Sequence, residues 1–248
     1  MHEANTLAVN ALLGGATAAV VQMAKGGPVW DAFWTGALGG GTAYAGKRVA
    51  VEEFAGAGFL GRQIASLGGS LVRNATAGRP LLEEVVLPLG PVRLYVSKAA
   101  GVQPRLDVAT LMAGAAFVIA YDARLDPAAS LSAGALVFRG SGPTPGMSGA
   151  GATMVWAEMP EEEGPRLMAH ERVHLLQYDQ AFLSWADPLE RWIAARAGAG
   201  AAVLRHFDFG GVVLGARVGL GLALEYSDRP WETEAYFLAE LAHPVHGH

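Results

Sequence analysis

Two histidines and a glutamate in the segment His170-Glu171-Arg172-Val173-His174 have the residue types and spacing of a metal site. Positions four residues apart share one face of an α-helix, so both imidazoles can reach the same divalent cation. Glu171 lies beside them and can point at a water molecule on that ion. This is the ligand arrangement of a zinc hydrolase, with His170 and His174 as ligands and Glu171 as the base.

The residues around this motif predict the helix that it requires. The acidic run Glu161–Glu163 comes shortly before Pro165, and proline is favoured at the first position of a helix. We therefore predict a helix over about 165–183. On it, Gln177 lies on the same side as the two histidines, three residues after His174. The alternative is that the histidines are ordinary packed or hydrogen-bonded helix residues, with the charged residues between them exposed.

A third metal ligand must come from elsewhere in the chain, because a catalytic zinc site holds three protein ligands and leaves one position for water. Pro230 begins a second predicted helix, with Glu232 and Glu234 in its first turns. Either carboxylate is a candidate ligand, with Glu232 first and Glu234 in reserve. The alternative for both is a charged helix N-terminus, which the helix dipole favours without a metal.

The HExxH motif and the later segment Glu232–Ala235 together resemble the gluzincin class of zinc metallopeptidases. In that class a glutamate from a later helix, often within an ExxA pattern, joins the two histidines. The resemblance covers about residues 150–240. Many members place an aspartate directly after the alanine, where this chain has Tyr236.

The resemblance implies a site, a cofactor and a reaction. The ligands of a Zn²⁺ ion would be His170, His174 and Glu232. The ion would lower the pKa of its water, and Glu171 would pass the proton of that water to the leaving amine of a peptide bond. Strand 152–157 would border the cleft and pair with a polypeptide substrate, the alternative being a plain edge strand. Four residues remain open as donors to the oxyanion: Tyr226, Tyr236, His206 and Arg229.

The composition excludes some functions and favours others. The 248 residues include no cysteine, which excludes disulfides, thiolate zinc ligands and a cysteine nucleophile. The formal net charge is -5 and the basic residues are scattered, so nucleic acid is not an expected partner. Hydrophobic residues make up 52% of the chain and charged residues 17%, with 33 glycines. Such values are typical of a protein that hides much of its surface in a bilayer or a larger assembly.

Residues 1–80 form a glycine-rich region that we expect to associate with a membrane or a partner protein. Uncharged runs within residues 5–24 and 32–46 predict two helices that meet through small residues, and residues 54–71 predict a third. These runs approach the 20 or so residues that a membrane span needs, but they are rich in alanine and glycine. Spanning helices, shallow insertion, a hairpin packed on a membrane protein and a buried soluble hairpin all stay open.

The ends of these helices carry residues that favour a membrane location. Two tryptophans and three basic residues there predict contact with lipid headgroups: Trp30, Trp34, Lys25, Lys47 and Arg48. The segment Gly41–Lys47 also matches the start of a phosphate-binding loop, but Arg48 stands where a serine or threonine must bind magnesium. Nucleotide is therefore not an expected ligand, and the side of the membrane stays open.

Residues 81–248 are expected to form a zincin-like α+β domain, with a small antiparallel sheet followed by a mostly helical C-terminal part. Short β-prone runs separated by turn residues predict the strands: 85–89, 92–96, 117–121, 135–138 and 153–156. Residues 106–120 could equally form a buried helix. Residues 140–151 are interpreted as a connecting loop, and residues 203–224 as a buried or membrane-facing helix.

Two functions from different classes follow. The first is a membrane-associated zinc metallopeptidase that hydrolyses a polypeptide. The second is a non-catalytic accessory or scaffold subunit of a membrane protein complex, which keeps a metallopeptidase-like fold. The glycine-rich front end supports the second, and the motif with its downstream glutamate supports the first.

Overall fold

The computed structural model describes residues 3–196, 203, 206–211 and 230–242. The helices and strands in chain order are α1 Glu3–Lys25, α2 Val29–Ala50, α3 Ala57–Ala77, β1 Glu84–Leu89, β2 Val92–Ser97, β3 Gly101–Asp107, α4 Val108–Tyr121, β4 Arg124–Leu125, α5 Pro127–Ala133, β5 Leu136–Gly140, β6 Gly146–Gly149, β7 Ala152–Trp156, α6 Gly164–Ala181, the π-helical turn η1 Phe182–Ala186, α7 Asp187–Ala194, β8 Phe207–Asp208 and α10 Pro230–Ala242. This order confirms the α+β class.

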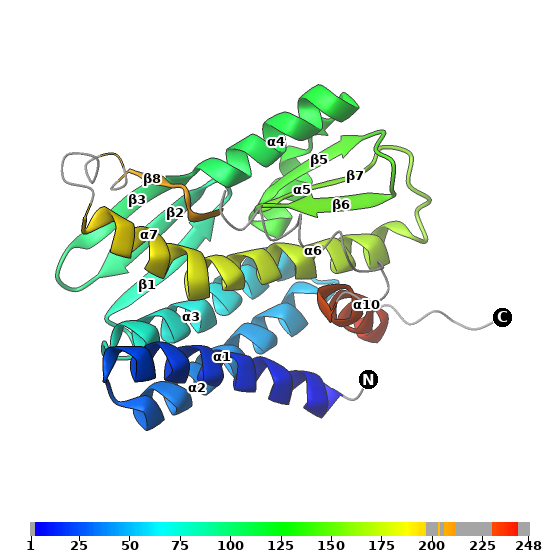
Figure 1. Cartoon of the computed structure of the whole chain (residues 1–248). Coiled ribbons are helices and arrows are strands. Elements are labelled where there is room, and N and C mark those ends of the chain that lie inside the picture. Colours follow the sequence, from blue (N-terminus) through cyan, green and yellow to red (C-terminus); the bar gives the residue numbers. More distant parts are fainter. Residues whose placement is uncertain (1–2, 197–202, 204–205, 212–229, 243–248) are drawn as a thin grey trace.

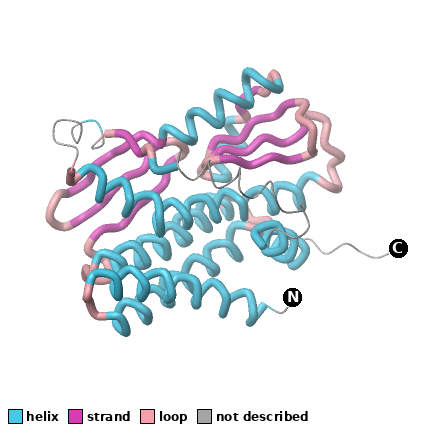
Figure 2. The backbone as a smooth tube through the Cα atoms, viewed as in Figure 1, coloured by secondary structure: helices cyan, strands magenta, loops and turns pink. Residues whose placement is uncertain are grey.

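Helix α6 runs through the middle of the molecule and continues through η1 into α7 (Figure 1). Helices α1, α2 and α3 lie on one side of it, and the sheet that contains β5, β6 and β7 lies on the other (Figure 2). Helix α10 packs against α6. The prediction of a helix over about 165–183 is confirmed, as is a helix that begins at Pro230. The predicted domain boundary near residue 80 stays a prediction.

The first three helices pack closely because small residues line their contacts. A Cβ on Gly40 of α2 would collide with the carbonyl oxygen of Asn10 on α1, and a Cβ on Gly46 would collide with the backbone of α3. Glycine therefore lets these backbones touch. The buried face of α1 is small or polar, whereas Leu13 and Val20 on its other face are about 60% exposed. Helix α1 is long and apolar enough to cross a membrane, by length and composition.

The predicted placement of Lys47 at a headgroup boundary is wrong. Its side chain is only 2% exposed and points into the protein, where it bonds to Asn10 and Glu234. The neighbouring Arg48 is partly exposed and pairs with Glu3. Trp30 and Trp34 are about 70% exposed, so these two keep the exposure that a lipid contact needs.

The strands form two small mixed sheets where one antiparallel sheet was predicted. Their orders are β1-β2-β3-β8 and β4-β5-β7-β6, with parallel pairs between β3 and β8 and between β5 and β7. Residues 117–121, predicted as a strand, belong to α4, whose start is fixed by the Asp107 carboxylate accepting from the Thr110 backbone N–H. The loop predicted over 140–151 contains β6, and most of the helix predicted over 203–224 lies outside the described residues.

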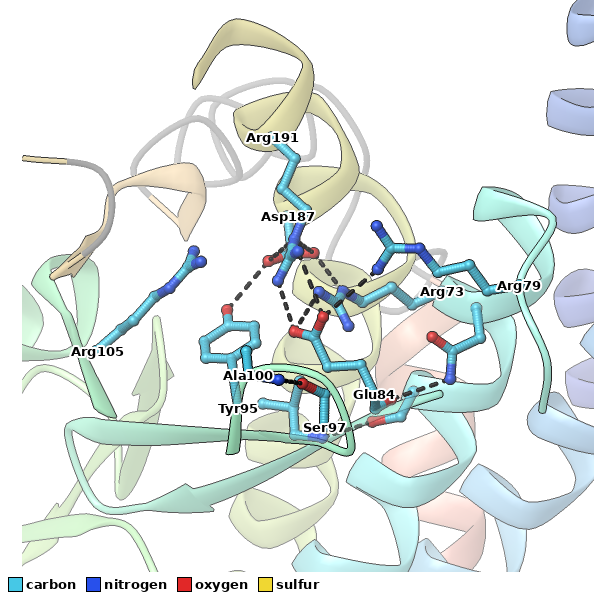
Figure 3. Close-up of polar contacts among 12 residues, drawn as sticks. Arg73, Arg79, Glu84, Tyr95, Ser97, Ala100, Arg105, Asp187 and Arg191 are labelled. Atoms are coloured by element: carbon cyan, nitrogen blue, oxygen red, sulfur yellow. Dashed lines mark hydrogen bonds and ion pairs between the residues drawn. The ribbon is translucent and has the colours of Figure 1, made fainter. Parts of the chain in front are cut away.

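The first sheet is joined to α3, α6 and α7 through a set of buried and partly buried arginines and carboxylates, here called the ion cluster. It contains equal numbers of the two kinds: Arg62, Arg73, Arg93, Arg105 and Arg191 with Glu84, Asp107, Asp179, Asp187 and Asp208. Figure 3 shows the part around Arg73, where Glu84 and Asp187 both bond to its guanidinium. Each charge meets at least one opposite charge, as burial of an ion requires.

Candidate metal centre

Apolar packing between α6 and α10 brings the predicted ligands together. Ala169 and Val173 of α6 are fully buried against Ala235, Leu238 and Ala239 of α10. These small and medium side chains let the two helices approach closely. Because the apolar residues of α6 flank the two histidines, the same contact places the start of α10 beside the motif.

Three donor atoms converge at this contact. Glu232 Oε2 lies 3.3 Å from His170 Nε2 and 3.2 Å from His174 Nε2, and the two Nε2 atoms lie 2.9 Å apart. His170 and Glu232 are buried, and the His174 side chain is 14% exposed. Two imidazoles and one carboxylate around one point are the donor set that divalent transition metals such as zinc accept. The structure thus brings together the three residues predicted as ligands.

The hydrogen bonds of Gln177 determine which nitrogen of His174 carries its proton. Gln177 Nε2 lies 2.9 Å from the Trp231 carbonyl oxygen and 2.8 Å from Glu234 Oε2, and both of these atoms only accept. The amide oxygen of Gln177 therefore faces His174 Nδ1, 2.9 Å away, and accepts its proton. In the neutral ring, His174 Nε2 then has a lone pair that points at His170 and Glu232.

The electrostatics of the group favour a cation. In neutral His174 the Nε2 lone pair faces the point where the three atoms meet, and in protonated His174 the Nε2–H donates to Glu232. Burial by itself lowers the pKa of His174, but the hydrogen bond to Glu232 and the charges of Glu171 and Glu232 raise it above its ordinary value. The group thus attracts positive charge, and the donor set fits a metal ion.

Glu171, the predicted base, is held by side chains of strands β6 and β7. Ser148 Oγ donates to Glu171 Oε2 over 2.5 Å, and Thr153 Oγ1 lies 3.5 Å from the same oxygen. A Cβ on Gly146 would collide with the other carboxylate oxygen, so only glycine fits there. Burial raises the pKa of Glu171, although His174 and the bond from Ser148 act against the rise.

The reserve ligand Glu234 has a different position. Its carboxylate accepts hydrogen bonds from Asn10, Lys47 and Gln177 and lies outside the three-residue group. Residues two apart on a helix point in nearly opposite directions, so only one of the two glutamates can face α6 at the histidines. Burial by itself raises the pKa of Glu234, but the Lys47 ammonium lowers it below the usual value.

The four predicted oxyanion donors differ in their position relative to the metal centre. The Tyr236 ring lies 4.4 Å from the His170 ring, centre to centre, so this residue does reach the site. His206 is an exposed residue in a turn before β8, away from the group. Tyr226 and Arg229 lie outside the described residues, as does the histidine-rich tail from residue 243.

The prediction that strand 152–157 pairs with a polypeptide substrate is wrong. Strand β7, which covers residues 152–156, is hydrogen-bonded on both sides, to β5 and to β6, so it has no free edge for a peptide. The edge strand of this sheet next to α6 is β6. This strand was not predicted, because its sequence is rich in glycine. Ser148 on β6 was missed for the same reason, and Asn10 and Lys47 were missed because their partner is far away in the sequence.

Comparison of the chain with known protein families, curated proteins and solved structures finds no match. What this chain shares with metal-dependent hydrolases is therefore the local arrangement of His170, His174 and Glu232 alone.

Proposed function

We propose that the chain is a membrane-associated, zinc-dependent metallopeptidase of gluzincin type. The observation that carries the proposal is the convergence of three ligand atoms, all within 4.8 Å of one another, on the HExxH helix and α10. His170, His174 and Glu232 would hold the ion. Bound there, zinc supplies Lewis-acid activation of a water molecule and of the scissile carbonyl.

Glu171 is the general base of this proposal. Its buried carboxylate takes a proton from the attacking water and delivers it to the leaving amine. Ser148 fixes the orientation of the carboxylate through one oxygen, Oε2. Tyr236, whose ring lies against His170, is the described residue best placed to donate its hydroxyl proton to the oxyanion.

The substrate side of the proposal rests on β6 and an adjacent cleft. Strand β6 is an edge strand, and an extended peptide can add to such an edge through backbone hydrogen bonds. A cleft of about 470 Å³ lies along α6, with Val155, Met159 and Leu167 in its wall. It adjoins the base, because Leu167 and Glu171 both face Gly146. Because Glu52, Glu53, Arg139 and Arg172 also line this cleft, a peptide with both apolar and charged side chains would fit this surface.

Membrane association is supported by the outward face of the first two helices. Three polar residues of α1, Thr6, Asn10 and Gln22, face the protein. The large apolar side chains that are exposed along α1 and α2 are Val9, Leu12, Leu13, Val20, Met23, Trp30, Trp34 and Leu38. This reverses the usual pattern of a soluble helix. A lipid surface or a membrane protein would cover this face.

The experiment is a measurement of bound zinc combined with a peptide-cleavage assay. We expect about one zinc ion per chain, and cleavage of a fluorogenic peptide library that stops on chelation. Glu171→Gln keeps the zinc and loses more than about 100-fold in cleavage rate, because it removes the base and leaves the ligands intact. The exposed Glu162→Gln is the matched control and cleaves normally. Purified protein without stoichiometric zinc refutes the proposal.

A second candidate is a non-catalytic subunit of a membrane complex, favoured by the large exposed apolar face. This candidate also binds zinc, but the wild-type chain then cleaves no member of the library. It predicts in addition that the protein elutes as a stoichiometric complex from detergent extracts. A detergent-free monomer contradicts it.

A further inference from the structure

A chain of hydrogen bonds connects the N-terminal helices to one histidine of the metal centre. Lys47 Nζ on α2 donates to both carboxylate oxygens of Glu234, over 3.0 and 2.8 Å. Asn10 on α1 donates to the same carboxylate over 2.8 Å and accepts from Lys47 over 3.0 Å. Gln177 joins this carboxylate to His174. This series of hydrogen bonds thus connects α1 and α2, through α10, to α6.

In each hydrogen bond of this series, the donor and the acceptor can be assigned in only one way. The ammonium group of Lys47 can only donate, and the ionised carboxylate of Glu234 can only accept. Gln177 must therefore turn its NH₂ group to Glu234 and its oxygen to His174. The charge on α2, together with the Trp231 carbonyl oxygen that also accepts from Gln177, thus favours a proton on His174 Nδ1 and, in the neutral ring, a lone pair on Nε2.

The chain is held in place by burial and by close helix packing. Lys47 and Asn10 are 2% and 4% exposed, so water does not replace their bonds. Asn10 can reach Lys47 because glycine at position 40 lets α1 and α2 touch at the carbonyl of Asn10. Asn10 is oriented further by its bond to the Thr6 carbonyl oxygen. The geometry leaves little freedom for other arrangements.

We propose that Lys47 and Gln177 are positioning residues of the metal centre, which set its affinity for zinc by fixing the proton of His174. This inference rests on the proposed function. Without the Lys47 ammonium the carboxylate of Glu234 loses its strongest partner. The Gln177 amide is then oriented by the Trp231 carbonyl oxygen and by a carboxylate that is itself held less firmly, so the amide turned by 180° becomes more accessible. A turned amide presents N–H groups to His174 Nδ1, which moves the proton to Nε2 and removes a ligand. Partners behind a histidine ligand typically change metal affinity by about 10- to 100-fold.

The test compares zinc affinity in Lys47→Met, Gln177→Met and Arg48→Met, measured by competition with a chromogenic chelator. We expect the dissociation constant to rise about 10- to 100-fold in the first two variants. Arg48→Met removes a charge from the next position of the same helix, where the ion pairs are exposed, and it should bind zinc like the wild type. Circular dichroism of each variant reports folding. If Lys47→Met does not fold, the double variant Lys47→Met with Glu234→Gln takes its place. The double variant leaves no buried carboxylate without its ammonium partner.

A second measurement needs no zinc. Nitrogen-15 spectra of the metal-free protein distinguish the two forms of neutral His174, with the proton on Nδ1 or on Nε2. We expect Nδ1–H in the wild type and Arg48→Met, and a shift toward Nε2–H in Gln177→Met. Zinc binding within twofold of wild type in folded Lys47→Met and Gln177→Met, or an unchanged proton position in Gln177→Met, overturns the inference. A wild-type chain that binds no zinc instead overturns the proposed function, while the spectra still decide the proton position.

Discussion

The ion cluster and the metal centre lie on one continuous helical rod, α6–η1–α7, yet their charges are balanced in different ways. In the ion cluster every buried carboxylate has an arginine partner from the chain itself, such as Asp179 with Arg62 and Asp187 with Arg73. In the metal centre Glu232 and two imidazoles point at one another. The first set is neutralised by arginines of the protein, and the second has a donor set that could hold a metal ion.

This difference separates a structural role from a binding role. Both regions are buried, and both contain several ionisable residues, so neither burial nor charge density identifies a site. The residue types and their convergence do, because arginines face carboxylates in the ion cluster, whereas two imidazole nitrogens and one carboxylate oxygen meet in the metal centre. Removing a residue of the ion cluster should therefore lower the stability of the protein, whereas removing a residue of the metal centre should lower its affinity for zinc.

The largest effect is expected from Arg93→Met in the ion cluster. Arg93 is 2% exposed and faces Asp107, Asp179 and Asp208, so its loss leaves carboxylates buried without enough positive charge. We expect the free energy of unfolding to fall by about 3–5 kcal/mol. Urea denaturation measures it. Arg139→Met, which breaks the exposed pair with Asp126, is the control and should cost less than about 1 kcal/mol. Equal losses would contradict the comparison.

An intermediate effect is expected from Glu232→Gln in the metal centre. The metal-free protein should keep its stability within about 1 kcal/mol, because glutamine keeps the size of the side chain and can still hydrogen-bond to the two imidazoles. The wild type should gain about 2.7 kcal/mol when zinc is present at 100 times its dissociation constant, and the variant should lose this gain. Thermal unfolding with and without zinc measures both. Glu240→Gln, an exposed change on the same helix, should retain the gain. A zinc effect that survives Glu232→Gln would refute the assignment of this ligand.

The smallest effect is expected from Glu190, at the edge of the ion cluster. Burial raises the pKa of Glu190 to about 7, and Asp208 and Asp187 add to the rise although backbone N–H groups of Gly210 and Phe209 oppose it. A folded-state pKa above the unfolded value means that protonated Glu190 favours folding at low pH. This contribution is lost as the pH rises through about 7.

We therefore expect the unfolding free energy of the wild type to fall by about 1 kcal/mol relative to Glu190→Gln between pH 5.5 and 8.5. Urea titrations at a series of pH values give the difference. The exposed Glu158→Gln should follow the wild type. Parallel curves for wild type and Glu190→Gln would show that this carboxyl does not titrate with folding.

The sequence predicted the parts of the site that depend on local spacing. The four-residue interval between His170 and His174, with the start signals of α6, was sufficient to place two donors on one helix face. The start of α10 at Pro230 was predictable as well. The choice between Glu232 and Glu234 depended on how α10 is rotated against α6, and the apolar residues of α10 fix that rotation only once α6 is there to pack against.

Other features were not predictable because their partners are distant in sequence. Lys47 interrupts a glycine- and alanine-rich run, and its local pattern fits a membrane boundary as well as a buried ion pair. Its partner Glu234 is 187 residues away. Strand β6 has the sequence Gly-Met-Ser-Gly, which lacks β-branched residues and acquires its strand geometry by pairing with β7.

The contact between α10 and the rest of the protein has a consequence for biosynthesis. Glu232 follows His174 by 58 residues, and Glu234 bonds to Asn10 across 224 residues. A growing chain that has not reached α10 carries only the histidine pair, with Gln177 lacking the carboxylate that orients it. The three-residue group can thus assemble only after the segment that carries Glu232 has been synthesised and has left the ribosome, so any metal bound by the three residues together binds after that point.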